Sequence, residues 1–314
     1  MKTLYLHIGR GKTGTTAQQR ALAAHRDALL AQGIDYILAG DEGKGGGHQD
    51  FAKSFIASRP AYMVPPKDPE ALRIETARQI AESPAPAVLL SSENFPLVDI
   101  AALRAWIEAL PTRIAVKVIL FARSQDDLAE SEYNQMVKLT FETRSPAEYA
   151  AALEGADFFA EAEAWAAHFG RDAVIARLYD GAGQDAVAQL GGCLPGAPDL
   201  PRAPNAASRQ GANRSLGARA LTVARLLNGA EVTDRHLRHT IFNAFDGKDL
   251  PAVLFSADEA RAIRARFADS NRRFAETYLG RTIDGDLGGR RYTDAERDRL
   301  FAAAQALHDA PEAR

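Results

Sequence analysis

The chain is poor in several features that define whole classes of protein. Its 314 residues include one cysteine, Cys193, which excludes an intrachain disulfide and allows a reducing compartment. No uninterrupted apolar run reaches the ~20 residues of a membrane-spanning helix. The N-terminus lacks the basic stretch and apolar core of a secretory leader. These absences predict a cytoplasmic protein without a membrane span.

The chain also lacks a large excess of charge of one sign, and it lacks the residue patterns of metal ligands. The formal net charge is -3, which argues against a nucleic-acid partner, because such a partner needs a basic surface. No cluster of His and Cys has metal-ligand spacing, so no metal site is expected. The Gly-x-Ser-x-Gly elbow of many hydrolases is also missing.

What the chain does contain is a regular alternation of strand-like and helix-like segments. Strands are expected at residues 4–8, 33–38, 87–91, 114–121 and 173–179, with helices at 17–31, 69–82, 100–110, 126–140 and 157–169. Beyond residue 180 only helices are expected, at 215–228, 256–279 and 293–308, the second opened by Ser256 and Glu259 at capping-box spacing. This order predicts an α/β fold, a P-loop NTPase-like three-layer sandwich with a central, mainly parallel sheet and a helical C-terminal third. We expect one domain over residues 1–314.

The most informative stretch is MKTLYLHIGRGKTGTT, residues 1–16. An apolar strand pattern runs into a glycine-rich turn that contains Lys12, and a helical pattern follows. Glycines allow the backbone to approach a ligand, and the unpaired N–H groups at a helix start point toward an anion. Lys12 adds positive charge, and Thr15 and Thr16 add hydroxyl donors. The stretch therefore predicts a site for a phosphate or sulfate ester.

The exact order of residues in this loop narrows the class of ligand that it is expected to bind. A Walker A motif needs glycine at position 6, where this chain has Leu6. The order Lys-Thr-Gly-Thr-Thr at 12–16 instead resembles the 5′-phosphosulfate loop of sulfotransferases that use 3′-phosphoadenosine-5′-phosphosulfate (PAPS). This resemblance implies PAPS as co-substrate and 3′,5′-ADP as product. The residues that it assigns to the donor are Gly11, Lys12, Thr13, Gly14, Thr15 and Thr16.

A second motif follows the most strand-like run of the chain. Arg123 stands at the end of that strand, and Ser131 comes eight positions later on the next expected helix. Ligands of open parallel sheets lie beyond the carboxyl ends of the strands, and a guanidinium suits a phosphate dianion. The pair resembles the sulfotransferase motif in which Arg and Ser bind the 3′-phosphate of PAPS. The alternative is an ion pair of Arg123 with Asp126 or Asp127.

Two residues are candidates for the base that takes a proton from the acceptor. Glu93 comes directly after the third expected strand, where several sulfotransferases place a glutamate similar to it. The alternative for Glu93 is a favourable charge at a helix start. His48, in a glycine-rich loop, is the competing base, because its ordinary pKa is near ~6.5.

A weaker signal lies in the connector after residue 191. Arg209, Gln210 and Gly211 resemble the late R-K-G loop with which many sulfotransferases close over the nucleotide, with Gln in place of Lys. Arg209 and Gly211 are therefore expected to contact the nucleotide. An ordinary polar loop before a helix is the alternative.

Together these motifs predict a PAPS-dependent sulfotransferase. The sulfuryl group would pass to a hydroxyl or amine of a small-molecule or glycan acceptor, whose identity the sequence does not specify. One alternative is a P-loop kinase or NTPase that uses ATP and Mg²⁺, with Glu93 as its acidic residue. The other is a catalytically silent nucleotide-binding protein.

Overall fold

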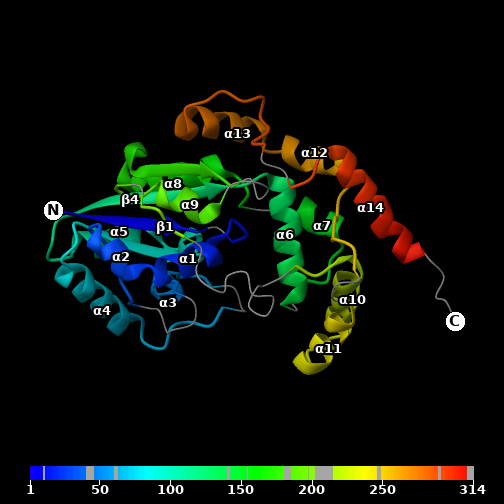
Figure 1. Cartoon of the computed structure of the whole chain (residues 1–314), viewed down its shortest axis with the longest axis horizontal. Helices are drawn as coiled ribbons and strands as arrows, with labels where there is room; N and C mark the ends of the chain where they lie inside the picture. Colours follow the sequence, from blue (N-terminus) through cyan, green and yellow to red (C-terminus); the bar gives the residue numbers. More distant parts are fainter. Residues whose placement is uncertain are drawn as a thin grey trace. The chain divides into compact units, whose positions relative to one another are not determined.

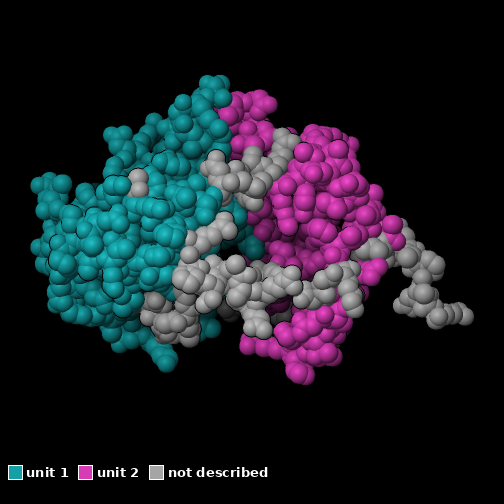
Figure 2. Space-filling view, in the orientation of Figure 1, with its two compact units in different colours: residues 1–122, 158–212, 273–282 teal, residues 123–157, 213–272, 283–314 magenta. Residues whose placement is uncertain are grey.

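The structure is a computed structural model. It describes residues 1–9, 11–39, 46–59, 63–139, 142–153, 155–179, 185–196, 198–201, 215–245, 249–288 and 291–309. Within these ranges the chain forms two compact units (Figure 2). Unit 1 comprises residues 1–122, 158–212 and 273–282, and unit 2 comprises residues 123–157, 213–272 and 283–314. The expectation of a single domain over the whole chain stays a prediction.

Unit 1 is built on a five-stranded, all-parallel sheet with the strand order β2-β3-β1-β4-β5 (Figure 1). The strands are Lys2–Ile8 (β1), Ile34–Tyr36 (β2), Ala87–Ser92 (β3), Ile114–Ala122 (β4) and Val174–Leu178 (β5). Every residue of β3 is buried, as expected for a parallel strand covered on both faces. The predicted α/β sandwich with a parallel central sheet is therefore confirmed.

Two of the longer helices of unit 1 begin directly after an aspartate that caps them. Asp68 caps the helix that follows it by accepting from Ala71 N, and Asp99 does the same through Ala102 N. The helices are Thr15–Ala24 (α1), Arg26–Ala31 (α2), Gln49–Lys53 (α3), Pro69–Glu82 (α4), Ile100–Glu108 (α5), Phe158–Phe169 (α8) and Ala186–Gly191 (α9). Shorter turns are Phe95–Leu97 (η1), Arg171–Ala173 (η2) and the π-helical Ala275–Leu279 (η3).

The core of unit 1 lies on both faces of the sheet. Leu22 of α1, Leu29 of α2 and Val187 of α9 pack with Leu89 and Phe121 of the sheet. On the sheet, α8 contacts β4 and β5, and α3 contacts β3. Burial of these side chains, each worth roughly 1.5–3 kcal/mol, fixes the helices and with them the loops at the carboxyl edge of the sheet.

All the regular secondary structure in the described residues of unit 2 is helical. Its helices are Gln125–Lys138 (α6), Pro146–Ala151 (α7), Ala218–Gly229 (α10), Arg235–Phe245 (α11), Ala257–Ala265 (α12) and Asp294–Asp309 (α14), and Ala268–Phe274 (α13) spans the boundary between the units. Tyr133 and Val137 of α6 form an apolar core with Leu221 and Ala224 of α10. In the described residues no strand follows β5, so the expected helical C-terminal third is confirmed.

Candidate functional site

The loop between β1 and α1 is shaped by backbone conformations that few residues adopt. Gly14 has φ 82° and ψ 7° and stands directly before the first residue of α1. Lys12 has φ 71°, which is uncommon for a residue with a side chain. Such backbone strain clusters at ligand sites, where the surrounding structure maintains it. The loop therefore has the conformation of a binding loop, at the carboxyl end of a strand central in the sheet.

Two glycines of this loop are required by close packing. A Cβ at position 9 would stand 2.4 Å from Cγ2 of Thr15, and one at position 14 would stand 2.8 Å from Cβ of Ala186. At position 11 a Cβ would meet nothing within 4 Å. Gly9 therefore allows the loop to fold tightly onto α1, and Gly14 allows it to approach α9, while the surroundings of Gly11 are open.

The start of α1 offers positive potential to an anion. The Gly14 carbonyl accepts from the N–H groups of Ala17 and Gln18, at 2.9 and 3.1 Å. Among the described residues no side chain caps this helix, and its first turn carries no acidic residue. The helix dipole and the first-turn amides therefore favour a negative ligand here. Thr13 and Thr15 are buried beneath the loop, and Thr16 is exposed.

Glu93 lies within electrostatic reach of Lys12. It follows the last residue of β3, which pairs with Ile8 at the end of β1. Burial raises the pKa of the Glu93 carboxyl, and the charge of Lys12 opposes that rise. A carboxylate with a raised pKa is the stronger proton acceptor. The structure thus brings together two of the residues that the sequence singled out.

His48 lies next to Ser91 of β3, but its ring nitrogens are occupied by the backbone. Nδ1 accepts from the N–H of Ser91 at 3.1 Å, so Nε2 carries the hydrogen and donates to the Ile37 carbonyl at 2.9 Å. The ring is fully buried. A base needs an accepting nitrogen that faces the substrate, and here that nitrogen is bound to Ser91. This geometry argues against His48 as the base, and we retain Glu93 for that role.

The glycines before His48 serve close packing. A Cβ at Gly46 would stand 2.7 Å from Cβ of Ala23, and one at Gly47 would stand 2.7 Å from Oε1 of Gln19. This segment therefore packs directly against α1. His7, at the end of β1, is likewise buried, with Nδ1 2.8 Å from Oγ of Ser91. Burial lowers the pKa of His7 to about 3, so this ring stays neutral and structural.

Arg123 and Ser131, the two candidates for binding a 3′-phosphate, belong to unit 2, with Arg123 just before α6 and Ser131 within it. Arg123 is buried, and its Nη2 lies 3.9 Å from Oδ2 of Asp127. Ser131 is half-buried one helical turn after Asp127, so these two side chains share a face of α6. The ion pair of Arg123 with Asp127, which was the alternative interpretation of Arg123 from the sequence, is thus present.

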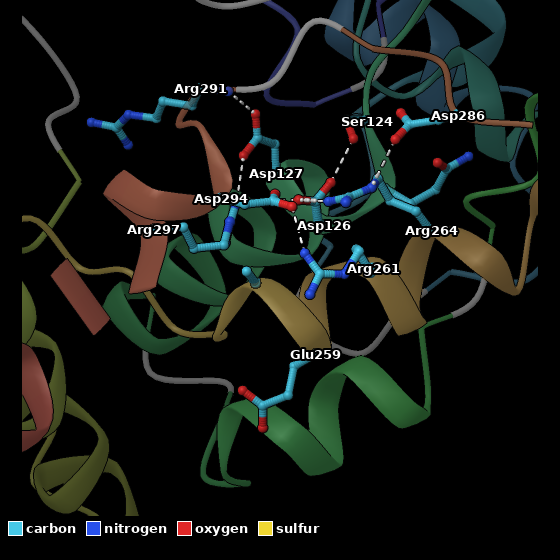
Figure 3. Close-up of polar contacts among 12 residues, drawn as sticks. Ser124, Asp126, Asp127, Glu259, Arg261, Arg264, Asp286, Arg291, Asp294 and Arg297 are labelled. Atoms are coloured by element: carbon cyan, nitrogen blue, oxygen red, sulfur yellow. Dashed lines mark hydrogen bonds and ion pairs between the residues drawn. The ribbon is translucent and has the colours of Figure 1, made fainter. Parts of the chain in front are cut away.

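The sequence patterns did not single out a buried ion cluster on the same turns of α6 (Figure 3). Arg297 of α14 donates to Asp126 at 3.1 Å, to Asp127 at 3.0 Å and to Glu130 at 2.5 Å. Arg264 of α12 donates to Asp126 at 2.7 Å. All five side chains are at most 7% exposed. Breaking one member of such a cluster leaves an uncompensated buried charge, which costs about 3–5 kcal/mol.

The cluster also shifts the pKa values of its carboxyls. Burial raises the pKa of Glu130 to about 7, against the opposing charge of Arg297 and a hydrogen bond from Leu254 N. Burial raises the pKa of Asp127 as well, and the neighbouring Asp126 adds to that rise. The cluster that binds α12 and α14 to α6 therefore contains a carboxyl that titrates near neutrality.

This titration predicts a pH-dependent stability. Glu130 holds its proton more tightly in the folded chain, so its contribution is complete below an unfolded pKa near 4.5 and is lost as the pH rises through about 7. Glu130→Gln keeps the accepting oxygen and removes the titration. We expect the unfolding free energy of the wild type, relative to this variant, to fall by about 3 kcal/mol between pH 4.5 and 8. Urea unfolding at several pH values measures it.

The control for this experiment is Glu231→Gln, at an exposed carboxylate of the same unit. Its unfolding free energy should follow the wild type at every pH. Parallel curves for the wild type and Glu130→Gln would contradict the assigned role of Glu130.

Some expectations from the sequence fall where the structure gives no description. Arg209 and Gly211 lie outside the described residues, so their contact with the nucleotide stays a prediction. Within the described ranges, no group of three or more His, Cys, Asp or Glu side chains could hold a metal ion. In the same ranges no helix is both long and apolar enough to cross a membrane.

Comparisons with known proteins add little to these observations. No family model matches the chain. No curated protein matches it either. Among solved structures, the crystal structure of a sulfotransferase from Alicyclobacillus acidocaldarius is similar, with a TM-score of 0.43 and 17% sequence identity, over 77% of this chain and 99% of that chain. A likeness at this level leaves the assignment of function to the residues themselves.

Proposed function

We propose that this protein is a sulfotransferase that transfers a sulfuryl group from PAPS to a hydroxyl or amine of a small-molecule or glycan acceptor. The observation that carries the proposal is the strained loop between β1 and α1, where Lys12 stands before an uncapped helix and within electrostatic reach of Glu93. The loop supplies positive potential for the donor, and the carboxylate supplies a base for the acceptor.

In this proposal the donor is held by two sets of residues. The amides of 11–16, with the hydroxyls of Thr15 and Thr16, bind the 5′-phosphosulfate, and Lys12 neutralises the phosphate as it leaves. Arg123 and Ser131 bind the 3′-phosphate. Arg209 and Gly211 close over the nucleotide, as the resemblance to the late basic loop of sulfotransferases implies.

The transfer itself is in line. The acceptor oxygen or nitrogen forms a bond to sulfur as the bond from sulfur to the 5′-phosphate oxygen breaks, and 3′,5′-ADP leaves with that electron pair. Glu93 takes the proton of the acceptor. Positioning and charge stabilisation are the main contributions of the protein, as in phosphoryl transfer. No metal ion is a part of this scheme.

Calorimetric titration with 3′,5′-ADP, 5′-ADP and ATP, each with and without Mg²⁺, tests the proposal. We expect tight binding of 3′,5′-ADP that does not depend on Mg²⁺, and weak binding of ATP. Mg²⁺-dependent binding of ATP without preference for a 3′-phosphate would favour a P-loop kinase or NTPase, for which Glu93 at the end of the apolar strand β3 would be the acidic residue. Nucleotide binding without turnover of PAPS would favour the silent nucleotide-binding protein.

Arg123→Met tests the 3′-phosphate assignment. Asp127 keeps the side chain of Arg297 and the N–H of Arg291 as partners, so we expect the variant to fold. Loss of the charged hydrogen bonds should weaken the binding of 3′,5′-ADP roughly 10–100-fold and leave the binding of 5′-AMP nearly unchanged. Arg235→Met, at an exposed arginine of α11, is the control. Equal losses for both nucleotides would show that Arg123 does not bind the 3′-phosphate.

A further inference from the structure

Gln49, the first residue of α3, makes contacts with the residues on both sides of Glu93. Its Oε1 accepts from Oγ of Ser92 at 2.7 Å and from Nδ2 of Asn94 at 3.1 Å. Ser92 precedes Glu93 in the chain, and Asn94 follows it. One amide oxygen therefore bridges the two neighbours of the proposed base.

The bridge is closed by a third hydrogen bond. Oγ of Ser92 accepts from the backbone N–H of Asn94 at 3.1 Å, which leaves the hydroxyl hydrogen of Ser92 to donate to Gln49. Ser92 is fully buried, and Gln49 and Asn94 are half-buried. The three side chains thus form a closed set of hydrogen bonds around the backbone of Glu93, in which each named donor has an acceptor.

Gln49 reaches this place because the residue before it is paired with the sheet. The N–H of His48 donates to the carbonyl of Ser91 at 2.7 Å, and the N–H of Ser91 donates back to Nδ1 of His48 at 3.1 Å. Gln19 of α1 also donates to the Ser91 carbonyl, at 3.3 Å. The pairing of residue 48 with residue 91 brings residue 49 to the turn that follows β3.

Among the described residues, few groups interact with the carboxylate of Glu93 itself. Burial and the charge of Lys12 are the influences on its pKa, and none of the described residues hydrogen-bonds its oxygens. Asp50 and Lys53, the charged residues of α3, pair with each other at 2.8 Å. The bridge at Gln49 therefore holds the two residues that flank Glu93 in the chain.

We propose that Gln49 is a positioning residue, which holds the turn of residues 92–94 so that the carboxylate of Glu93 faces Lys12. This inference rests on the proposed function for its catalytic meaning, because Glu93 is the proposed base. The geometric part of it stands by itself. A bridge of this kind keeps a base in its productive direction, which is where much of the efficiency of general-base catalysis originates.

The test measures the coupling between Lys12 and Glu93 directly. The pKa of Glu93 is followed by carbon NMR on protein labelled at the glutamate carboxyl, in four forms: wild type, Lys12→Met, Gln49→Met and the double variant. In the wild-type background, removing the charge of Lys12 should raise the pKa of Glu93, because that charge opposes the effect of burial. In the Gln49→Met background we expect less than half of that rise. The same rise in both backgrounds would overturn the proposal.

Two further variants keep the test decisive if Gln49→Met folds poorly. Gln49→Glu retains oxygens that accept from Ser92 and Asn94, so it should preserve the coupling to Lys12 while its own charge raises the pKa of Glu93. Asn94→Ala removes one side of the bridge and should reduce the coupling partially. Full coupling in Asn94→Ala, or none in Gln49→Glu, would contradict the proposed bridge.

The same variants separate this inference from the proposed function. With PAPS alone, water is the acceptor, and release of 3′,5′-ADP measures turnover. Gln49→Met should lower kcat about 10-fold and leave the KM for PAPS unchanged, with Gln49→Glu closer to the wild type. If the wild type fails to turn over PAPS, the proposed function fails, and the NMR cycle still decides whether Gln49 orients Glu93.

Discussion

Lys12→Met is expected to lower the turnover of PAPS by a factor of ~10²–10³, the usual cost of removing one preorganised charge from a transition state. Methionine keeps the aliphatic part of the lysine side chain and meets the same backbone strain at φ 71°, so the substitution removes the ammonium group. In the proposed mechanism Lys12 acts on charge that develops as the phosphate leaves, so kcat should fall more than the affinity for 3′,5′-ADP. Single-turnover release of 3′,5′-ADP measures the effect.

The matched control is Lys67→Met, at an exposed lysine of the same unit. It should leave turnover unchanged. Circular dichroism and thermal unfolding establish that both variants keep the fold. Near-normal turnover in Lys12→Met would remove Lys12 from the mechanism.

Glu93→Gln is expected to lower kcat by a factor of ~10²–10⁴, the range that general-base catalysis contributes. The amide keeps the size of the side chain but accepts no proton. In the wild type the base acts only when ionised, and burial raises its pKa. The rate should therefore rise with pH through a pKa above the ordinary range of glutamate, and this acidic limb should be absent from the variant. A pH profile of kcat measures both effects.

Glu82→Gln, at an exposed glutamate on α4, is the control for charge removal and should retain the profile of the wild type. A Glu93→Gln enzyme with an unchanged profile would show that another group takes the proton. Loss of Mg²⁺-dependent ATP binding in Glu93→Gln would instead support the kinase alternative, because Glu93 would then serve the metal.

Most of the fold was predictable because its signals are local. The five expected strands are all present, and the capping box of Ser256 and Glu259 forms with both of its hydrogen bonds. The helix expected at 17–31 divides at His25, whose backbone leaves the helical region at φ -112° and ψ 22°. The helix α7 was missed, although Ser145 and Glu148 have capping-box spacing and form that box. That signal was in the sequence.

Boundaries were less predictable, because distant side chains set them. The strand expected at 33–38 begins at Ile34 and ends at Tyr36. The N–H groups of Leu38 and Ala39 both donate to Oε1 of Gln79 on α4, at 3.0 and 3.1 Å. The Gln79 side chain, and not a neighbouring strand, therefore accepts these hydrogen bonds. The end of the strand thus depends on a side chain about 40 positions away that competes with the sheet for backbone hydrogen bonds, and no local pattern reveals it.

The local sequence accounts for the glycine-rich loop between β1 and α1, since glycine, lysine and threonine at fixed spacing act through local backbone geometry. It also determined the parallel sheet, because β-branched runs between amphipathic helices have few other ways to be buried. The tertiary structure adds how the surroundings of the two candidate bases differ. The ring of His48 is engaged by Ser91 and Ile37, whereas Glu93 lies near Lys12.

The bridge at Gln49 and the cluster at Arg297 were decided by the tertiary structure. Gln49 and Ser92 are 43 positions apart, and Arg297 and Asp126 are 171 positions apart. An ordinary glutamine and an ordinary arginine carry no local signal of such partners. The physical reason is that hydrogen bonds and ion pairs act over a few ångströms in space, whatever the separation along the chain, so their partners are set when the units fold.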